Sequence, residues 1–287
     1  MKISEIISQW YRHNKIFWSD LWLNRKIDRT LRDIKINRLY DDVHANYSPC
    51  FILSTGRCGT KLLTHIFEEH ASLSAFHNPK PELTHYSRFA YTHAFGKPEL
   101  LEYIIDACRY EPIRDMYLAN LQYVETNNRI TFYAYALHKL YPSAKFIHLI
   151  RSPRDFIISG SSRGWYTNSQ LYDEARIHPR NGQDAFDSYN QLEKIAWLWN
   201  ATNQFIHDFK CTIPDDKILT VKAENLFNNV DTSLRIFKFL GVDPILIKKI
   251  SSIISRKINR QKKDKSIDKN ELEEIIQNIA PLNNTYY

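Results

Sequence analysis

The stretch CFILSTGRCGTKLLTHIFEE, residues 50–69, decides the fold of this chain. Its first part, Cys50–Ser54, is a short apolar run, which predicts a buried strand. Two glycines follow, Gly56 and Gly59, and Lys61–Glu69 then has apolar residues at helical spacing. A strand, a glycine-containing loop and a helix in this order present backbone N–H groups to a phosphate.

The loop between this strand and helix is not a Walker A sequence. Gly59 is followed by Thr60 and Lys61, and the Ser or Thr that would hold magnesium is replaced by Leu62. Arg57 adds a permanent, forked positive charge. The loop alone leaves two interpretations open, an anion site or an ordinary strand-to-helix turn with a capping Thr.

A second apolar run, Lys145–Ile150, predicts another buried strand and ends in Arg151. Walker-type nucleotidases place an acid here to hold Mg²⁺, so a cation favours a second anionic group on the ligand and no metal. Pro153 favours a helix start, and Ser159 follows Arg151 by eight positions, near enough for both to reach one phosphate. The alternative is a surface Arg–Asp pair with a capping turn.

The rest of the chain alternates strand and helix patterns, which predicts a three-layer α/β/α fold with a central parallel sheet. A third strand is expected at Lys217–Val221, and a strand or helix edge at Ile130–Tyr135. Helices are expected at 99–127, 184–209 and 231–240, the last one capped by Gly241, with a polar loop at 164–182. Ser266 or Asp268 is expected to cap a final helix that runs through Ile279.

The composition indicates the charge of the expected binding partners but not their identity. The 287 residues carry a net charge of +7, which favours anionic partners such as phosphate-bearing cofactors, polyanionic glycans, nucleic acid or acidic membranes. The four cysteines form no CxxC pair, so no structural zinc site is expected. Residues 1–20 match neither a signal peptide nor a membrane span, and a cytoplasmic location is the default prediction.

The chain is expected to divide into an N-terminal helical extension, residues 1–45, and a single domain, residues 46–287. Within the extension, residues 3–37 combine aromatic and basic side chains at helical spacing. Such a helix either packs on the domain or contacts a membrane surface or a second subunit.

Together, the loop at 54–61 and the segment from Arg151 to Ser159 resemble the PAPS-dependent sulfotransferase family, which has a P-loop NTPase-like fold. The resemblance implies that the donor PAPS (3'-phosphoadenosine 5'-phosphosulfate) binds with its 5'-phosphosulfate at the loop and its 3'-phosphate at Arg151 and Ser159. The matching loop residues are Gly56, Arg57, Cys58, Gly59, Thr60 and Lys61. Weaker matches are Val221–Leu226, Phe237–Gly241, and a basic loop in which Arg260 and Lys262 would close over the 3'-phosphate.

The resemblance also implies a reaction. A sulfuryl group would pass from PAPS to a hydroxyl or amine of a glycan, lipid-linked or small-molecule acceptor, leaving PAP as product, with no metal and no nucleic-acid partner. Two residues depart from the family pattern, because Cys58 replaces a Ser and Lys61 replaces a Thr, so two hydroxyl contacts are lost.

Four residues are candidates for a part in catalysis, one for charge stabilisation and three for proton transfer. Arg57 would stabilise the charge that grows on the leaving oxygen. The resemblance implies that the proton acceptor lies on the segment after the loop helix. Asn78 stands about where several relatives have Glu, and an amide cannot serve as a base. His77 is therefore the first candidate base, with Glu82 second and His85 third.

Two other functions remain open from the sequence. A P-loop nucleotide kinase would depend on Mg²⁺, and a non-catalytic polyanion-binding protein would bind with a steep salt dependence. Basic composition does not separate the second of these from a sulfotransferase.

Overall fold

The structure is a computed structural model that describes residues 20–28, 30, 36–167, 175–180, 184–255 and 267–287. Its centre is a five-stranded sheet in the order β2-β3-β1-β4-β5, with every neighbouring pair of strands parallel. The strands are β1 (Cys50–Leu53), β2 (Leu73–Phe76), β3 (Gln122–Glu125), β4 (Lys145–Ile150) and β5 (Ile218–Lys222). The strand order changes direction beside β1, and open α/β sheets bind ligands at the carboxyl edge of such a point.

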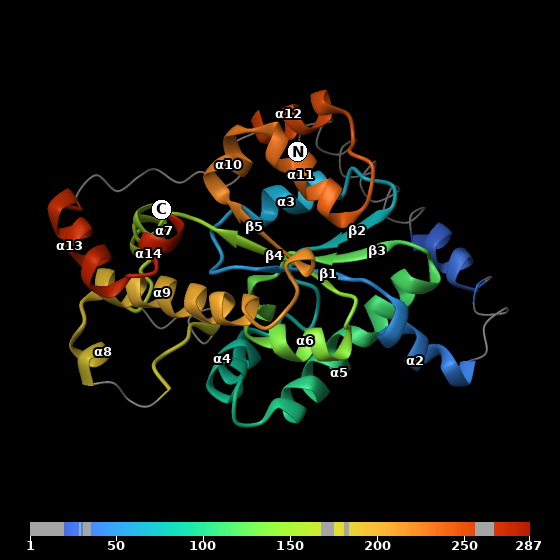
Figure 1. The fold of residues 1–287 in the computed structure, drawn as a ribbon, viewed down its shortest axis with the longest axis horizontal. Helices are drawn as coiled ribbons and strands as arrows, with labels where there is room; N and C mark the ends of the chain where they lie inside the picture. Colours follow the sequence, from blue (N-terminus) through green and yellow to red (C-terminus); the bar gives the residue numbers. More distant parts are fainter. Residues whose placement is uncertain (1–19, 29, 31–35, 168–174, 181–183, 256–266) are drawn as a thin grey trace, which may run out of the picture.

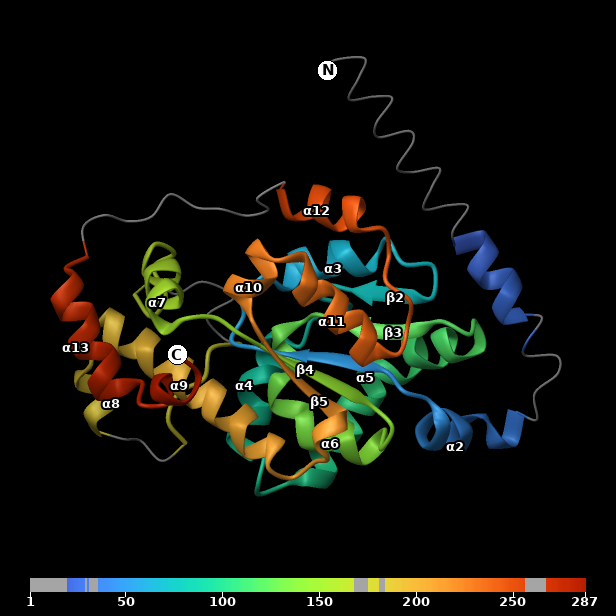
Figure 2. The ribbon, with the colours of Figure 1, turned by 45° about the horizontal axis from the view of Figure 1, so that its top comes forward.

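Helices cover both faces of the sheet and produce three layers (Figures 1 and 2). One layer contains α3 (Thr60–Phe67), α10 (Ala223–Asn228), α11 (Val230–Leu240) and α12 (Ile247–Ser255). The other contains α4 (Thr84–His93), α5 (Pro98–Leu118), α6 (Ala134–Leu140) and α9 (Gln191–Lys210). The remaining helices are α2 (Ile36–Asn46), η1 (Asn128–Tyr133), α7 (Pro153–Ser161), α8 (Asp184–Ser188), η3 (Asp215–Lys217), α13 (Lys269–Ile279) and α14 (Asn283–Tyr286). The predicted three-layer α/β/α fold with a central parallel sheet is confirmed.

The central strand β1 explains why its sequence is continuously apolar. Phe51 and Leu53 point into the hydrophobic cluster on one face of the sheet, and Cys50 and Ile52 into the cluster on the other. All four side chains are fully buried. A strand covered on both faces needs apolar residues at every position, so the alternation seen in half-exposed strands is absent.

Two predicted elements differ from the structure, and a third prediction, which left two alternatives open, is decided by it. The helical pattern at 99–127 is α5 only as far as Leu118, and the chain then enters β3, because Asn120 adopts a left-handed conformation (φ 51°) that ends the helix. The segment 184–209 is two helices, because Asn190 starts α9 with a capping box and thereby separates it from α8. Of the two alternatives predicted for 130–135, a strand or a helix edge, the structure shows the helix edge, because these residues form the end of η1 and the start of α6.

Several predicted helix ends are confirmed. Gly241 closes α11 in the left-handed conformation at φ 80°. The side chain of Asp268 accepts hydrogen bonds from two backbone N–H groups at the start of α13. Pro153 is the first residue of α7, after the cap Ser152.

The N-terminal part lies mostly outside the described residues. Residues 20–28 are helical, and Leu23 and Ile27 pack against the core, whereas Trp22 is 55% exposed. In α2, Leu39 and Val43 are buried. A boundary at residue 45 and a membrane or subunit contact through residues 3–37 stay predictions.

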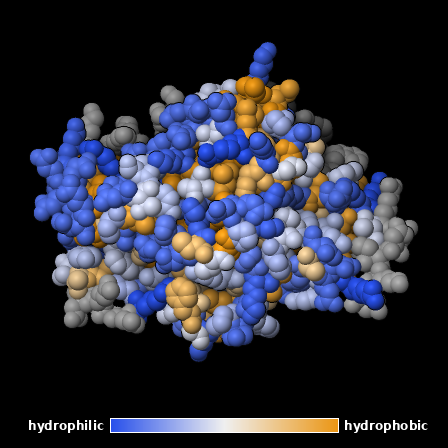
Figure 3. All heavy atoms as spheres, in the orientation of Figure 1, coloured by the Kyte–Doolittle hydropathy of each residue, from blue (hydrophilic) through white to orange (hydrophobic). Residues whose placement is uncertain are grey.

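The outer surface is mainly hydrophilic in the view of Figure 3, with hydrophobic residues gathered over the region of α12 at the top. Leu246 and Ile247, at the start of this helix, are exposed. Within the described ranges, no helix combines the length and the apolar character needed to cross a membrane.

Candidate active site

The loop after β1 has the backbone geometry of an anion cradle. Gly56, Arg57 and Gly59 all have positive φ angles, of 78°, 58° and 94°. α3 begins directly after it at Thr60, so the first N–H groups of the helix face the same space. No described residue accepts a hydrogen bond from the backbone N–H groups of Arg57, Cys58 or Gly59. Successive free N–H groups at a helix start bind anions.

Both glycines of the loop have positive φ and close neighbours, and the contact is tightest at Gly59. A Cβ at Gly59 would lie 2.6 Å from the ring of Phe227 on α10. A Cβ at Gly56 would lie 3.1 Å from the side chain of Asn128 on η1. The loop is therefore held between residues from two other elements, which preserves its shape without a ligand.

Cys58 turns its side chain away from the anion cradle. Its thiol is fully buried and donates to the carbonyl of Gly56 at 3.0 Å, with Thr55 Oγ1 3.2 Å away. Burial raises the pKa of this thiol to about 11, so it stays protonated. Cys58 thus stabilises the loop from inside, and only its backbone N–H faces a ligand.

Arg57 and Arg151 meet at the carboxyl edge of the sheet. Arg151 follows β4 and donates from Nη1 to the carbonyl oxygen of Arg57 at 3.0 Å. Burial lowers the pKa of Arg57, and the positive charge of Arg151 lowers it further. Nε of Arg57 is buried and has no hydrogen-bond partner among the described residues. A buried donor without an acceptor fits a site whose acceptor is an anionic ligand.

A third arginine, which the sequence analysis missed, joins this pair. Arg163 donates from Nη1 to the hydroxyl oxygen of Ser159 at 2.8 Å. Burial lowers the pKa of Arg163 to about 10, with the charges of Arg57 and Arg151 acting in the same direction. The spacing of four residues from Ser159 is a signal in the sequence that the two side chains lie close together, but the predicted site ended at Ser159.

The predicted 3'-phosphate residues are held by a frame of hydrogen bonds. The indole of Trp199 donates to the carbonyl of Arg151 at 2.8 Å. Glu224, just after β5, accepts from the backbone N–H of Ser152 at 2.9 Å and from the Tyr287 hydroxyl at 2.8 Å. Asp155, in the first turn of α7, lies 3.6 Å from Arg151. Glu224 and Tyr287 were not predicted as part of this frame.

His77 lies beside the first turns of α3. It follows β2, is exposed, and its Nδ1 is 3.0 Å from the hydroxyl of Thr126, which itself contacts Thr64 of α3 at 2.7 Å. Partial burial of the ring lowers the pKa of His77, and the charge of Lys61 adds to this. His77 is thus neutral at neutral pH, as a general base must be.

Glu82, the second candidate base, is engaged in an ion pair. Its carboxylate accepts from Arg129 Nη1 at 2.7 Å. His85, the third candidate, lies on the exposed side of α4 beside the ring of Tyr86. The structure therefore places only His77 in a chain of contacts with the helix that follows the loop.

Two predicted donor residues are not described. Arg260 and Lys262 lie between α12 and α13, outside the described residues. Among the described residues, no group of three or more His, Cys, Asp or Glu side chains is arranged to hold a metal ion.

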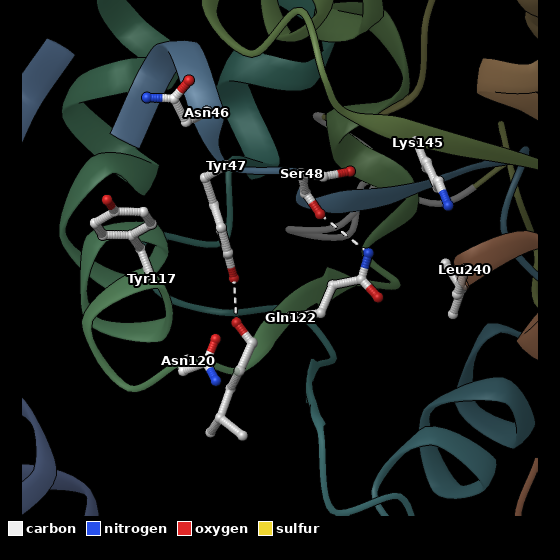
Figure 4. Close-up of a pocket in the computed structure, with 9 residues that line it drawn as sticks. Asn46, Tyr47, Ser48, Tyr117, Asn120, Gln122, Lys145 and Leu240 are labelled. Carbon is white, nitrogen blue, oxygen red and sulfur yellow. Dashed lines mark hydrogen bonds between the residues drawn. The ribbon is translucent and has the colours of Figure 1, made fainter. Parts of the chain in front are cut away.

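A pocket of about 430 Å³ lies at the opposite, amino edge of the sheet (Figure 4). Its lining includes Ser48, which precedes β1, and the first residues of β3 and β4, Gln122 and Lys145. None of the predicted site residues lines it. Because open α/β sheets bind ligands at the carboxyl edge, the arginine-lined loop is the better candidate active site.

Comparison with known proteins finds one matching sequence family and several solved structures of similar fold. A family model described as "Sulfotransferase family" matches residues 49–245. The fold is similar to the crystal structure of sulfotransferase STF9 from Mycobacterium avium, with a TM-score of 0.50 and 10% identity over 91% of this chain and 82% of that chain.

A second solved structure, a sulfotransferase from Alicyclobacillus acidocaldarius, gives a TM-score of 0.49 and 18% identity over 82% of this chain and 92% of that chain. Because STF9 is only 10% identical to this chain, its similarity shows a shared fold and nothing more. A search of curated protein sequences gave no match.

Proposed function

Since the chain belongs to the sulfotransferase family and is a transferase, we propose that it moves a sulfuryl group from PAPS to a hydroxyl or amine of an acceptor. PAPS is the second substrate of this reaction. Its 5'-phosphosulfate would lie in the loop at residues 56–61, and its 3'-phosphate at Arg151, Ser159 and Arg163.

The convergence of Arg57, Arg151 and Arg163 carries this proposal. Each of the three side chains has at least one guanidinium neighbour of the same charge, and no carboxylate contributes to the pKa shifts of Arg57 or Arg163. Like charges at close range destabilise an empty site, and a ligand with several negative charges reverses this effect. A donor with phosphate groups at both its 3' and 5' positions supplies such charge.

The residues of the site support an in-line displacement. Free backbone N–H groups and Arg57 stabilise the negative charge that develops on the leaving phosphate oxygen. His77 accepts the proton of the acceptor hydroxyl or amine. PAPS supplies the sulfuryl group and a good leaving group, so the protein contributes position, charge and one proton acceptor.

Calorimetric titration with PAP, once in a buffer that contains Mg²⁺ and once in a buffer that contains EDTA, tests the assignment of PAPS as the donor. PAP should bind equally in both buffers, since arginines neutralise it. Arg151→Ala should weaken the binding of PAP by about 2 kcal/mol. It should weaken the binding of adenosine 5'-phosphosulfate much less, because this ligand lacks the 3'-phosphate. Ser159→Ala should act in the same direction but less.

Arg154 provides a matched control on the same helix. Its guanidinium pairs with Glu273 of α13 at 3.0 Å, so Arg154→Ala should leave PAP affinity unchanged. Equal losses of both ligands in Arg151→Ala would contradict the 3'-phosphate assignment. An affinity that collapses in EDTA would favour a nucleotide kinase, and salt-dependent binding without PAP release from PAPS would favour a polyanion-binding protein.

A further inference from the structure

A buried hydroxyl connects His77 to the helix that follows the loop. Thr126 lies just after β3 and is fully buried. Its Oγ1 is 3.0 Å from His77 Nδ1 and 2.7 Å from Thr64 Oγ1. Thr64 in turn donates to the carbonyl of Thr60, the first residue of α3, at 2.9 Å. These contacts form one continuous chain from the start of α3 to the imidazole ring.

Counting protons gives this chain a direction. The carbonyl oxygen of Thr60 can only accept, so the single hydroxyl proton of Thr64 lies in that bond. At the 2.7 Å contact Thr126 must then be the donor, since otherwise two oxygens would meet with no proton between them. Thr126 has no second proton, so it accepts at its contact with His77. The proton in that bond therefore belongs to Nδ1 of His77.

Two other arrangements of the protons can be compared with this one. The carbonyl of Phe76 lies 3.4 Å from Thr126 Oγ1, but a proton given to Phe76 would equally be unavailable to His77. The reversed chain would leave the Thr64 hydroxyl oxygen and the Thr60 carbonyl oxygen 2.9 Å apart without a proton. Only this reversed direction, in which Thr64 donates to Thr126 and Thr126 donates to Nδ1, would place the imidazole proton of His77 on Nε2. The repulsion between the oxygens of Thr64 and Thr60 opposes it.

We propose that Thr126 is a positioning residue that holds neutral His77 as the Nδ1–H tautomer and so leaves the Nε2 lone pair to accept the acceptor's proton. This inference rests on the proposed function, because it deepens the role of His77 as the base. Nε2 makes no hydrogen bond to any described residue, and the residue is exposed.

The proposed step balances in atoms and charge. The acceptor oxygen or nitrogen forms a bond to sulfur, while the bond between sulfur and the phosphate oxygen of PAP breaks. The acceptor's proton moves to Nε2, and the resulting imidazolium keeps its Nδ1–H donated to Thr126. A hydroxyl that already accepts from Nδ1 needs no rearrangement during this transfer.

The tautomer can be measured directly by ¹⁵N NMR of protein labelled at histidine, with the His77 signals assigned by their loss in His77→Gln. Wild-type protein and Thr126→Ser, which keeps the hydroxyl, should show Nδ1–H. Thr126→Val has the same shape without the hydroxyl and should shift His77 towards Nε2–H. With a simple alcohol or amine as acceptor, Thr126→Val should release PAP from PAPS roughly tenfold more slowly than the wild type. Its affinity for PAP should be unchanged.

The wild-type spectrum decides the tautomer once the His77 signals are assigned, so this part of the test does not depend on the folding of Thr126→Val. Neutral His77 protonated at Nε2 would overturn the inference, and so would a tautomer shift in Thr126→Val with no loss of rate. If wild-type His77 is Nδ1–H but PAP neither binds nor is released from PAPS, the proposed function fails while the assigned tautomer is supported.

Discussion

Replacing Arg163 with Gln should weaken PAP binding and leave the unliganded protein at least as stable as the wild type. Gln retains an N–H donor for the hydroxyl of Ser159, which Arg163 contacts at 2.8 Å, but removes the charge. Arg163 is partly buried close to Arg57 and Arg151, and burial together with these two charges lowers its pKa to about 10. The empty site therefore holds this charge at a cost in free energy.

The two expected effects have opposite signs and different sizes. One pKa unit corresponds to about 1.4 kcal/mol, but solvent screens a side chain that is only partly buried. Removing the charge should therefore raise the free energy of unfolding by at most about 1 kcal/mol. Losing a charge-assisted hydrogen bond to phosphate should cost about 2 kcal/mol, or roughly a 30-fold rise in the Kd for PAP.

Calorimetry with PAP and thermal melting without ligand measure both effects on the same preparation. Arg154→Gln is the matched control, because it removes an arginine of α7 that pairs with Glu273 instead of facing the loop. A variant that melts several degrees lower and binds PAP like the wild type would refute the reasoning. Arg163 would then be a structural tie to α7.

Three further predictions test other parts of the molecule. His77→Ala should keep PAP affinity but lower turnover by roughly a hundredfold, whereas Glu82→Gln should be mild because Arg129 holds that carboxylate; steady-state kinetics that show the opposite order would reverse the two roles. Gly59→Ala should abolish PAP binding in calorimetry, since its Cβ would meet Phe227 at 2.6 Å and its φ is 94°; near-normal affinity would contradict the described loop. Burial lowers the pKa of His44, but its hydrogen bonds and the charge of Asp106 outweigh burial and raise it. The ion pair of His44 with Asp106 therefore contributes fully to the free energy of unfolding below the unfolded-state pKa of about 6.5. This contribution is lost as the pH rises through the folded-state pKa. Urea midpoints should show this loss in the wild type and not in Asp106→Asn, and parallel curves for the two proteins would contradict it.

The sequence predicts β1, β4 and β5 and misses β2 and β3. β1 and β4 are apolar along most of their length, so their patterns are unambiguous. β2 and β3 have four residues each, and β3 ends in Glu125. Tyr123 and Asn127 donate hydrogen bonds to that carboxylate, but its buried charge is balanced by Arg109 of α5, which donates two hydrogen bonds to it at 2.8 and 3.0 Å. Such compensation comes from a distant element, and no local pattern announces it.

The candidate site shows the same division. Glycines and cations next to predicted strands, such as Gly56, Arg57 and Arg151, could be found because strand ends and loops have local signatures. The contact of Tyr287 with Glu224 joins residues 63 positions apart in the sequence, and the inward direction of the Cys58 thiol depends on the path of the loop. These features follow from tertiary packing, so a single sequence does not contain a readable signal for them.

The strand order itself explains how one edge of the sheet can serve an in-line transfer. The loop after β1 lies between the ends of β3 and β4. The cations that we assign to the leaving PAP, Arg151 and Arg163, follow β4 on one side. His77 and Thr126 follow β2 and β3 on the other side. In-line displacement needs the attacking group and the leaving group on opposite sides of sulfur. A sheet that changes direction at β1 supplies these two sides from separate strands, so the proton acceptor and the anion-binding arginines do not compete for the same space.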